Sequence, residues 1–358
     1  MSTSSKPVHI LVVGAGAVGC FYGSRLHHPD KNIFVSLVCR SNYSAIRSTG
    51  VKIETKQLGN YTFHPHAVYS SNTSASTSQI APPEGWDYIL LTTKALPGIV
   101  DDPGEIAPLV NKAPAGRTCI VLIQNGIGIE SPHRARFPQN PIISVVTTIS
   151  AEQTSPGVIR HNRWTRAHMG LYSTGPTGQT PFPPSEARRG KDLLDQLVHI
   201  MRDLGGIKDA SAHTESELLE VRWHKICINA AFNPSSILCG GLGNAAMIRD
   251  VEMLTHIKGC MHEVFDAAPA VVGRPLGEHL AKPEIIIKST AKNAGAKPSM
   301  LLDWERGRPM ELEAILGNPI RLAREKGVEM PRLQTLYALL SSAQRVREEQ
   351  KKGGEAKL

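Results

Sequence analysis

The sequence lacks a membrane-spanning segment, a zinc-binding motif and a signal peptide. No apolar run approaches the roughly 18–20 residues that a bilayer-spanning helix needs. The six cysteines form no Cys-x-x-Cys pair and have no histidine at zinc-finger spacing. The first residues, MSTSSKP, have neither the charged start nor the apolar stretch of a signal peptide. We therefore expect a cytoplasmic protein with buried free thiols, no membrane segment and no metal.

Charge and composition limit the function classes further. The chain has 358 residues, of which 41% are hydrophobic and 20% charged, which is typical of a soluble globular protein of two domains. Lys+Arg (40) exceed Asp+Glu (32) by 8, but the basic residues are dispersed, which argues against nucleic-acid binding. A moderate positive excess suits an anionic small substrate or cofactor. The oligomeric state stays open, with a homodimer as one expectation.

The first part of the chain reads as a parallel sheet between helices. Continuous apolar runs, rather than alternating ones, indicate strands that are covered on both faces. Such runs occur at Val8–Val13, Asn32–Cys39, Asp87–Thr93, Thr118–Ile123 and Pro141–Ser150. Helical or loop stretches separate them, which predicts a Rossmann-like, doubly wound α/β domain. The Pro/Gly/Ser-rich stretch 173–190 reads as a loop or insertion.

The rest of the chain is predominantly helical. An amphipathic helix is predicted at 191–204, and further helices at 216–238, 247–272, 278–295, 299–305 and 310–326. The predicted architecture is an α/β NADP-binding domain over residues 1–210 and an all-helical substrate domain over 211–345. Residues 346–358, rich in charge, are predicted to form a disordered tail.

The strongest local motif is Gly14-Ala15-Gly16-Ala17-Val18-Gly19, which has the form G-x-G-x-x-G. It follows an apolar strand and opens a helix-compatible stretch, as a dinucleotide-binding turn requires. The first glycine permits the tight turn, the second lets the backbone approach a pyrophosphate, and the third allows close strand–helix packing. Free N–H groups at the helix start would hold the phosphates. The alternative interpretation is a glycine-rich turn that binds no ligand.

Three more polar side chains follow predicted strands. Arg40 stands after the second strand, where NAD-binding proteins usually have a carboxylate, and its guanidinium can pair with a 2′-phosphate. This favours NADPH/NADP⁺ over NAD. Lys94 and Asn125 directly follow the next two strands. Because ligands sit beyond the carboxyl ends of parallel strands, we expect the glycine turn, Arg40, Lys94 and Asn125 to converge. Taken singly, each could be a surface charge or a turn residue.

A polar stripe crosses an otherwise apolar helix at 216–238. Lys225, Asn229 and Asn233 are spaced i, i+4 and i+8, so they share one face across roughly 12 Å. The surrounding residues are apolar, which indicates a buried helix whose polar stripe meets polar partners or a ligand. A desolvated lysine can act as a general acid toward a carbonyl oxygen. Alternatively, the asparagines bond to a neighbouring helix and Lys225 extends into solvent.

Together these motifs resemble the ketopantoate reductase family (2-dehydropantoate 2-reductases). The resemblance runs from about Val8 to Leu336 and rests on motifs that occur in order. These are GAGAVG, the Arg40 strand end, TTKA around Lys94, IQNGIG around Asn125, SPGVIRH, RWHKICINAAFNP and PSMLLDWERGRPMELEAILG.

The resemblance implies roles for individual residues. Lys225 is similar to the family's proton donor, and Asn125, Asn229, Asn233, Asn244 and Ser299 to its substrate-binding residues. The implied cofactor-binding residues are Gly14, Ala15, Gly16, Ala17, Val18, Gly19, Arg40, Lys94, Asn125, Ala151 and Glu311. Asn244 matches only with a one-residue shift, because the usual Asn-Gly-Glu-Leu is replaced here by Gly243-Asn244-Ala245-Ala246-Met247.

The sequence therefore predicts an NADP-dependent oxidoreductase of pantothenate biosynthesis. The expected reaction is hydride transfer from NADPH to a 2-keto acid, 2-dehydropantoate giving (R)-pantoate, with Lys225 as the proton donor. The keto acid is expected to enter between the two domains. Two alternatives stay open: a reductase of the same fold that acts on a different keto, amino or sugar acid, and an NADPH-binding regulatory protein that has lost catalysis.

Overall fold

The computed structural model describes residues 6–111, 113–173, 184–292 and 297–355. The chain divides into two compact units. The first consists of Met1–Lys94, Asp101–Gln124 and Ile129–Leu218, and the second of Ala95–Val100, Asn125–Gly128 and Leu219–Leu358. The second unit therefore takes two short segments from the first part of the chain, a division that a single boundary near residue 210 does not anticipate.

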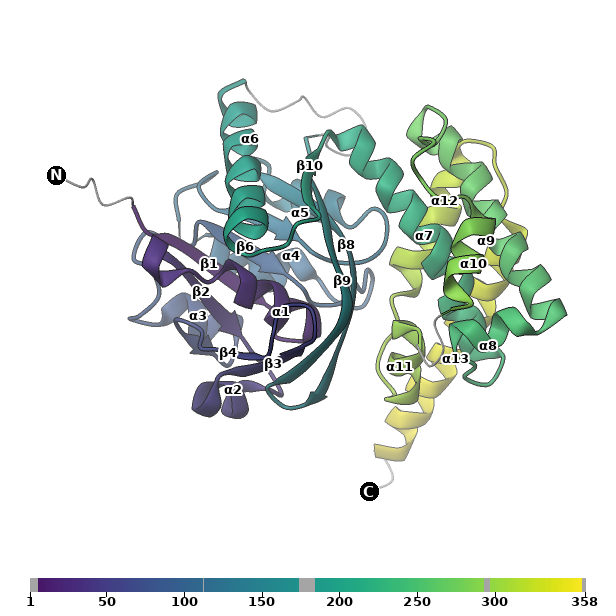
Figure 1. Ribbon diagram of the computed structural model, residues 1–358, viewed down its shortest axis with the longest axis horizontal. Coiled ribbons are helices and arrows are strands. Elements are labelled where there is room, and N and C mark those ends of the chain that lie inside the picture. The colour runs from purple at the N-terminus through teal and green to yellow at the C-terminus, as the bar shows by residue number, and fades with distance from the viewer. Residues whose placement is uncertain (1–5, 112, 174–183, 293–296, 356–358) are drawn as a thin grey trace. The chain divides into compact units, whose positions relative to one another are not determined.

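The first unit is built on one ten-stranded sheet (Figure 1). Along the path of paired strands the order is β4-β3-β9-β8-β7-β6-β1-β2-β5, and β10 pairs with β9. The strands are β1 (Val8–Val13), β2 (Ile33–Val38), β3 (Val51–Thr55), β4 (Tyr61–Phe63), β5 (Val68–Tyr69), β6 (Tyr88–Leu91), β7 (Cys119–Leu122), β8 (Ile142–Ser155), β9 (Val158–Leu171) and β10 (Ala210–His213).

Strands β8, β7, β6, β1, β2 and β5 are mutually parallel and form the doubly wound centre that the sequence predicts. Their order is that of the dinucleotide-binding fold, with β1 between β2 and β6 at the point where the chain reverses its direction across the sheet. All five predicted apolar runs form strands of this centre. Continuous apolar character predicts them well because both faces of the central strands are covered.

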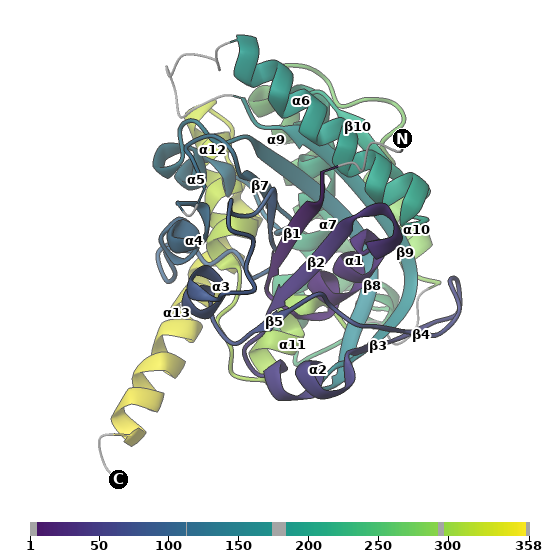
Figure 2. The ribbon, with the colours of Figure 1, turned by 90° about the vertical axis from the view of Figure 1, so that its left-hand side faces the viewer.

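The helices of the first unit cover both sides of the parallel strands. Figure 2 shows α1 and α6 on one side and α3, α4 and α5 on the other. These elements are α1 (Ala17–Leu26), α2 (Tyr43–Thr49), α3 (Asn72–Thr77), α4 (Asp102–Val110), α5 (Glu130–Arg136) and α6 (Pro184–His199), with short η1 (Pro29–Lys31) and η2 (Ile200–Leu204). Phe21 and Tyr22 of α1 and Leu197 of α6 are fully buried against the strand side chains of this core.

The sheet extends beyond the predicted parallel strands. β8 and β9 form a long antiparallel hairpin, whose strands in Figure 1 run side by side, and β3, β4 and β10 enlarge the sheet beside it. β9 alternates between buried and exposed residues, so an apolar-run criterion misses it. The predicted loop 173–190 needs a correction too. Residues 174–183 lie outside the described residues, but α6 already begins at Pro184.

The second unit is helical. It contains most of α7 (Glu215–Leu238), then α8 (Asn244–Arg249), α9 (Val251–Val272), α10 (Pro283–Thr290), α11 (Ser299–Glu305), η3 (Glu313–Gly317), α12 (Asn318–Glu325) and α13 (Pro331–Glu355). The predicted helix 247–272 begins later, since extended Asp250 ends α8 and its carboxylate caps α9 by accepting from the Met253 N–H at 2.8 Å. Trp223, Phe232 and Ile315 lie in one apolar core.

The predicted disordered tail, residues 346–358, needs a correction, because residues 346–355 form the end of α13. Residues 356–358 lie outside the described part of the chain. Charged residues read as a solvated tail can equally form the exposed end of a long helix. Leu333, Leu336 and Leu340 of the same helix are buried in the core of the second unit, so its first part is anchored. In the part of the chain that the structure describes, no helix is long and apolar enough to cross a membrane.

The turn after β1 shows why two of its glycines cannot carry side chains. A Cβ on Gly19 would overlap the Gly14 carbonyl oxygen and the Thr92 hydroxyl, and Gly14 itself has a φ of 108°. Thr92 donates a hydrogen bond to the Gly14 carbonyl at 2.6 Å, which joins the end of β6 to the turn. At Gly16, in contrast, a Cβ would meet nothing within 4 Å. The first and third glycines therefore serve packing, while the second faces open space.

We predict that Gly19→Ala destabilises the protein by about 1–3 kcal/mol, because the added methyl group must displace backbone or Thr92. The matched variant Gly16→Ala should leave the stability nearly unchanged, since its methyl group has room. Urea unfolding followed by circular dichroism measures both. Equal unfolding midpoints for Gly19→Ala and the wild type would contradict the packing that the structure shows.

Candidate active site

The predicted cofactor residues of the first unit lie at the carboxyl ends of three adjacent strands. The glycine turn Gly14–Gly19 follows β1, Arg40 follows β2 after one buried residue, and Lys94 comes three residues after β6. The first turn of α1 begins at Ala17, and its N-cap residue Gly16 makes no side-chain capping hydrogen bond. The N–H groups at this helix start can therefore donate hydrogen bonds to an anion.

Arg40 is exposed, whereas Lys94 is partly buried. An exposed guanidinium beyond β2 can form a forked pair with a phosphate group.

A side-chain bridge that the sequence analysis missed supports the turn from outside. The Asn42 amide donates to the carbonyl of Ala15 at 2.7 Å and to the Gln153 side chain at 2.8 Å, and the Gln153 amide donates back to Asn42 Oδ1 at 2.9 Å. Gln153 lies on β8, two residues after Ala151, so both share one face of the strand. The predicted cofactor contact Ala151 therefore belongs to the strand that braces the glycine turn.

The second unit brings three predicted residues together around an ammonium group. Lys225 Nζ of α7 donates to Asn125 Oδ1 at 2.7 Å. The Asn125 amide in turn donates to Glu311 Oε2 at 3.5 Å, and Glu311 Oε1 accepts from the backbone N–H of Ala95 at 3.2 Å. These contacts join all three chain segments that make up the second unit. Within the second unit, Asn125 therefore has Lys225 and Glu311 as its side-chain partners.

The surroundings of Lys225 weaken its hold on the proton. Burial is the largest cause and lowers its pKa to about 8 from the ordinary 10.5, the positive charge of Arg222 lowers the pKa further, and Glu311 opposes both. Arg222 stands one helical turn before Lys225 on α7. A lysine with such a pKa is largely protonated at neutral pH and still releases its proton readily.

The turn that carries Asn125 is fixed on both sides. Gly126 has a φ of 104°, and a Cβ there would overlap Ala314. Its carbonyl accepts from Arg222 Nη1 at 2.8 Å. The next residue, Ile127, donates its N–H to the Ala314 carbonyl at 2.8 Å and accepts from Asn318 Nδ2 at 2.7 Å. The position of the Asn125 amide is therefore set by backbone contacts as well as by its own hydrogen bonds.

The remaining predicted substrate residues also belong to the second unit. Asn229 and Asn233 follow Lys225 along α7, and the Asn233 amide nitrogen is buried without a hydrogen-bond partner in the described part of the chain. Asn244 begins α8, and its buried Oδ1 likewise has no partner there. Ser299 is exposed as the first residue of α11. The hydrogen bonds described above for the ammonium cluster do not involve Asn244 or Ser299.

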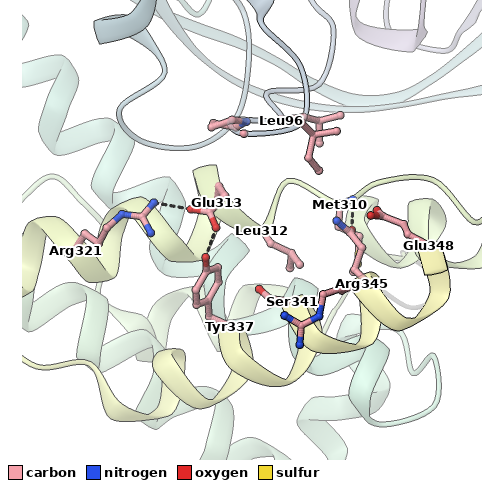
Figure 3. A pocket seen from close by; sticks show the side chains of 13 residues that line it. Leu96, Met310, Leu312, Glu313, Arg321, Tyr337, Ser341, Arg345 and Glu348 are labelled. Carbon is pink, nitrogen blue, oxygen red and sulfur yellow. Dashed lines mark hydrogen bonds and ion pairs between the residues drawn. The ribbon is translucent and has the colours of Figure 1, made fainter.

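A separate pocket of about 540 Å³ lies in the second unit between the segment around Leu96 and α13 (Figure 3). In it the Glu313 carboxylate accepts from Arg321 at 2.5 Å and from the Tyr337 hydroxyl. None of the predicted site residues lines this pocket, although Met310 and Leu312 on either side of Glu311 do. Lys225 and this pocket are therefore distinct features of the second unit.

Arg222 and the bracing pair Asn42 and Gln153 are not among the residues predicted from the sequence. A signal was available for Arg222, because the i−3 spacing places it on the Lys225 face of the helix. None was available for the other two, which are 111 residues apart in the chain.

The structure describes no group of three or more His, Cys, Asp or Glu side chains placed to hold a metal within residues 6–111, 113–173, 184–292 and 297–355. All six cysteines are free, and five are buried.

Comparison with known proteins covers both units. Residues 10–174 match the family model "Ketopantoate reductase PanE/ApbA", and residues 217–344 match "Ketopantoate reductase PanE/ApbA C terminal". The chain is 31% identical to an uncharacterized protein of Saccharomyces cerevisiae, over 96% of this chain and 95% of that protein. It is 25% identical to 2-dehydropantoate 2-reductase of Nostoc sp., over 91% and 92% of the two chains.

Solved structures show the same architecture. The crystal structure of 2-dehydropantoate 2-reductase from Methylococcus capsulatus has a TM-score of 0.74 and 35% identity, covering 95% of this chain and 98% of that one. The fold is also that of D-mandelate dehydrogenase in a complex with NADH and anilino(oxo)acetate, at a TM-score of 0.69 and 20% identity over 95% and 100% of the two chains. With family models matching its α/β part and its helical part, and a relative above 30% identity along nearly its whole length, this chain belongs to the ketopantoate reductase family.

Proposed function

We propose that the protein is an NADPH-dependent reductase of 2-keto acids that converts 2-dehydropantoate to (R)-pantoate, a step of pantothenate biosynthesis. The observation that carries the proposal is the lysine of α7. Its Nζ donates to Asn125 Oδ1 at 2.7 Å, and its pKa is lowered to about 8. The family membership and the names of the relatives from Nostoc and Methylococcus support the same reaction.

The residues of the first unit fit a phosphorylated dinucleotide. Open space at Gly16 leaves room for a pyrophosphate against the backbone, and the α1 N-terminus has N–H groups without a side-chain cap. Arg40 would hold the 2′-phosphate, and Lys94 and Ala151 would line the remainder. NADPH supplies the hydride that reduces the keto carbon.

The residues of the second unit fit the other half of the reaction. When a keto carbon is reduced, negative charge develops on its oxygen and must be stabilised or neutralised. The Lys225 ammonium would donate a proton from Nζ to that oxygen, while Asn125 Oδ1 holds the ammonium in place. Glu311 orients the Asn125 amide by accepting from its Nδ2.

Substrate recognition would fall to the asparagines along α7. The Asn233 amide, buried and without a hydrogen-bond partner in the described part of the chain, can donate to a substrate oxygen. Asn229 lies between it and Lys225, and we propose Ser299 and Asn244 as further contacts. Holding the substrate in register with the acid contributes to the rate through proximity.

The direct test is NADPH oxidation at 340 nm with 2-dehydropantoate and a panel of other 2-keto, amino and sugar acids. The proposal expects the highest kcat/KM for 2-dehydropantoate. Faster turnover of another 2-keto acid would show that this compound is the substrate, and the proposed reaction class would stay the same. Cofactor binding without turnover of any compound would instead support a regulatory protein.

Replacing Lys225 with alanine should reduce kcat by about 10²–10⁴-fold and leave the Kd for NADPH nearly unchanged, because the proton donor is lost and the cofactor residues are intact. Lys258→Ala, which removes an exposed lysine of α9, is the matched control and should retain wild-type kcat. A Lys225→Ala protein with full turnover would exclude this lysine as the acid.

The rate should fall at alkaline pH. Because lysine is cationic below its pKa, the proton donor is present below about pH 8 and is lost as the pH rises above it. We expect kcat/KM to decline tenfold per pH unit above this value. Lys225→Arg stays charged throughout, so its slower reaction should lack this decline. A wild-type profile that is flat to pH 10 would contradict the lowered pKa.

Arg40→Asp should change the cofactor preference. Removing the guanidinium and adding a carboxylate should raise the Kd for NADPH by about tenfold or more and affect NADH less, since only NADPH carries the 2′-phosphate. Arg47→Asp, at an exposed position of α2, gives the same change in net charge and should leave the ratio of the two Kd values unaltered. Binding titrations followed by nicotinamide fluorescence measure both variants. An unchanged NADPH:NADH ratio in Arg40→Asp would place the phosphate elsewhere.

A further inference from the structure

A buried arginine stands beside the acid and has no role in the function proposed so far. Arg222 lies on α7 one turn before Lys225, and only 4% of its surface is exposed. Placing a guanidinium in such surroundings is costly unless its N–H groups are bonded. One of these bonds runs from Nη1 to the carbonyl of Gly126, at 2.8 Å.

This bond reaches the residue directly after Asn125, the hydrogen-bond acceptor of Lys225. Gly126 adopts a φ of 104° in close contact with Ala314, so the turn has little freedom to adjust if the bond is lost. Two residues of α7 therefore contact the Asn125-Gly126 turn. Arg222 holds the backbone of the turn, and Lys225 bonds to the side chain that the turn presents.

We propose that Arg222 is the positioning residue of the proton donor: it fixes the Asn125-Gly126 turn and keeps a second positive charge beside the Lys225 ammonium. The proposal rests on the proposed function in that it takes Lys225 as the acid. Arg222 acts through Lys225 and Asn125 and need not touch the substrate.

The charges around Lys225 set the direction of the effect. Arg222 from α7 and Glu311 from the segment before η3 are the charged groups that act on it, and Asn125 is neutral. Arg222 favours the neutral amine and Glu311 the ammonium, while burial, the larger influence, also favours the amine. Removing Arg222 should therefore raise the pKa of Lys225, but not as far as 10.5.

Three substitutions separate the charge from the hydrogen bond. Arg222→Gln removes the charge and retains an amide N–H for the Gly126 carbonyl. Arg222→Lys retains the charge, and Arg222→Met removes both charge and donor. Arg249→Gln, at an exposed position of α8, is the control for the loss of a positive charge from the second unit.

The first readout is the alkaline limb of kcat/KM. It should stay near pH 8 in Arg222→Lys and Arg249→Gln and move to higher pH in Arg222→Gln and Arg222→Met. The Met variant should also lose about 10–100-fold in kcat, since a small misplacement of a reacting group costs that much, while the Kd for NADPH stays unchanged. A purely structural role would reduce the amount of folded protein without moving the limb.

The second readout needs neither substrate nor cofactor. The pKa of Lys225 is obtained by titrating the ¹³Cε signals of labelled lysines, with Lys225 assigned by its absence in Lys225→Arg. A failure to reduce any 2-keto acid would reject the proposed function and leave this titration able to test Arg222. If Arg222→Met does not fold, the Arg222→Gln and Arg222→Lys variants still test the role of Arg222. An unchanged Lys225 pKa and pH limb in folded Arg222→Gln would overturn the proposal.

Discussion

The hydrogen bond from Lys225 to Asn125 is the interaction on which the second unit's chemistry depends. A lysine in the middle of an apolar helix would ordinarily extend its ammonium to water, because burying the charge is unfavourable. Here an amide oxygen accepts from it, and that amide is itself fixed by Glu311 and by a turn that tolerates only glycine. The ammonium is therefore held in a defined place. This is the condition under which a lysine can serve as an acid near neutral pH.

In the first unit, too, a tightly packed backbone turn determines the geometry of the proposed site. Its glycine turn is packed so tightly against Thr92 that the backbone conformation is fixed, yet the space at Gly16 is open. Asn42 braces the turn by donating to the Ala15 carbonyl, and two hydrogen bonds with Gln153 of β8 hold the Asn42 side chain. In both units a rigid backbone turn presents one polar feature in a fixed position. In the first it is the α1 N-terminus, and in the second the Asn125 side chain.

Much of this organisation could be predicted from the sequence, because short-range patterns determine it. The apolar runs before Gly14 and Asn125 predict the parallel strands, and the i, i+4, i+8 spacing from Lys225 predicts a shared helical face. Strand β9 was missed because its residues alternate in burial. The braces on the glycine turn were missed because Asn42 and Gln153 meet only through the fold. Asn125 illustrates the limit best. Its position after β7 was predicted, but its partners Lys225 and Glu311 lie 100 and 186 residues away.

The most direct test of the account is a crystal structure of the protein with NADP⁺ and the hydroxy acid that it forms. The account predicts the Lys225 ammonium within hydrogen-bond distance of the 2-hydroxyl group, with Asn125 still accepting from it. An ammonium turned away from that hydroxyl, or bound to the carboxylate of the acid instead, would contradict the assignment of Lys225 as the proton donor.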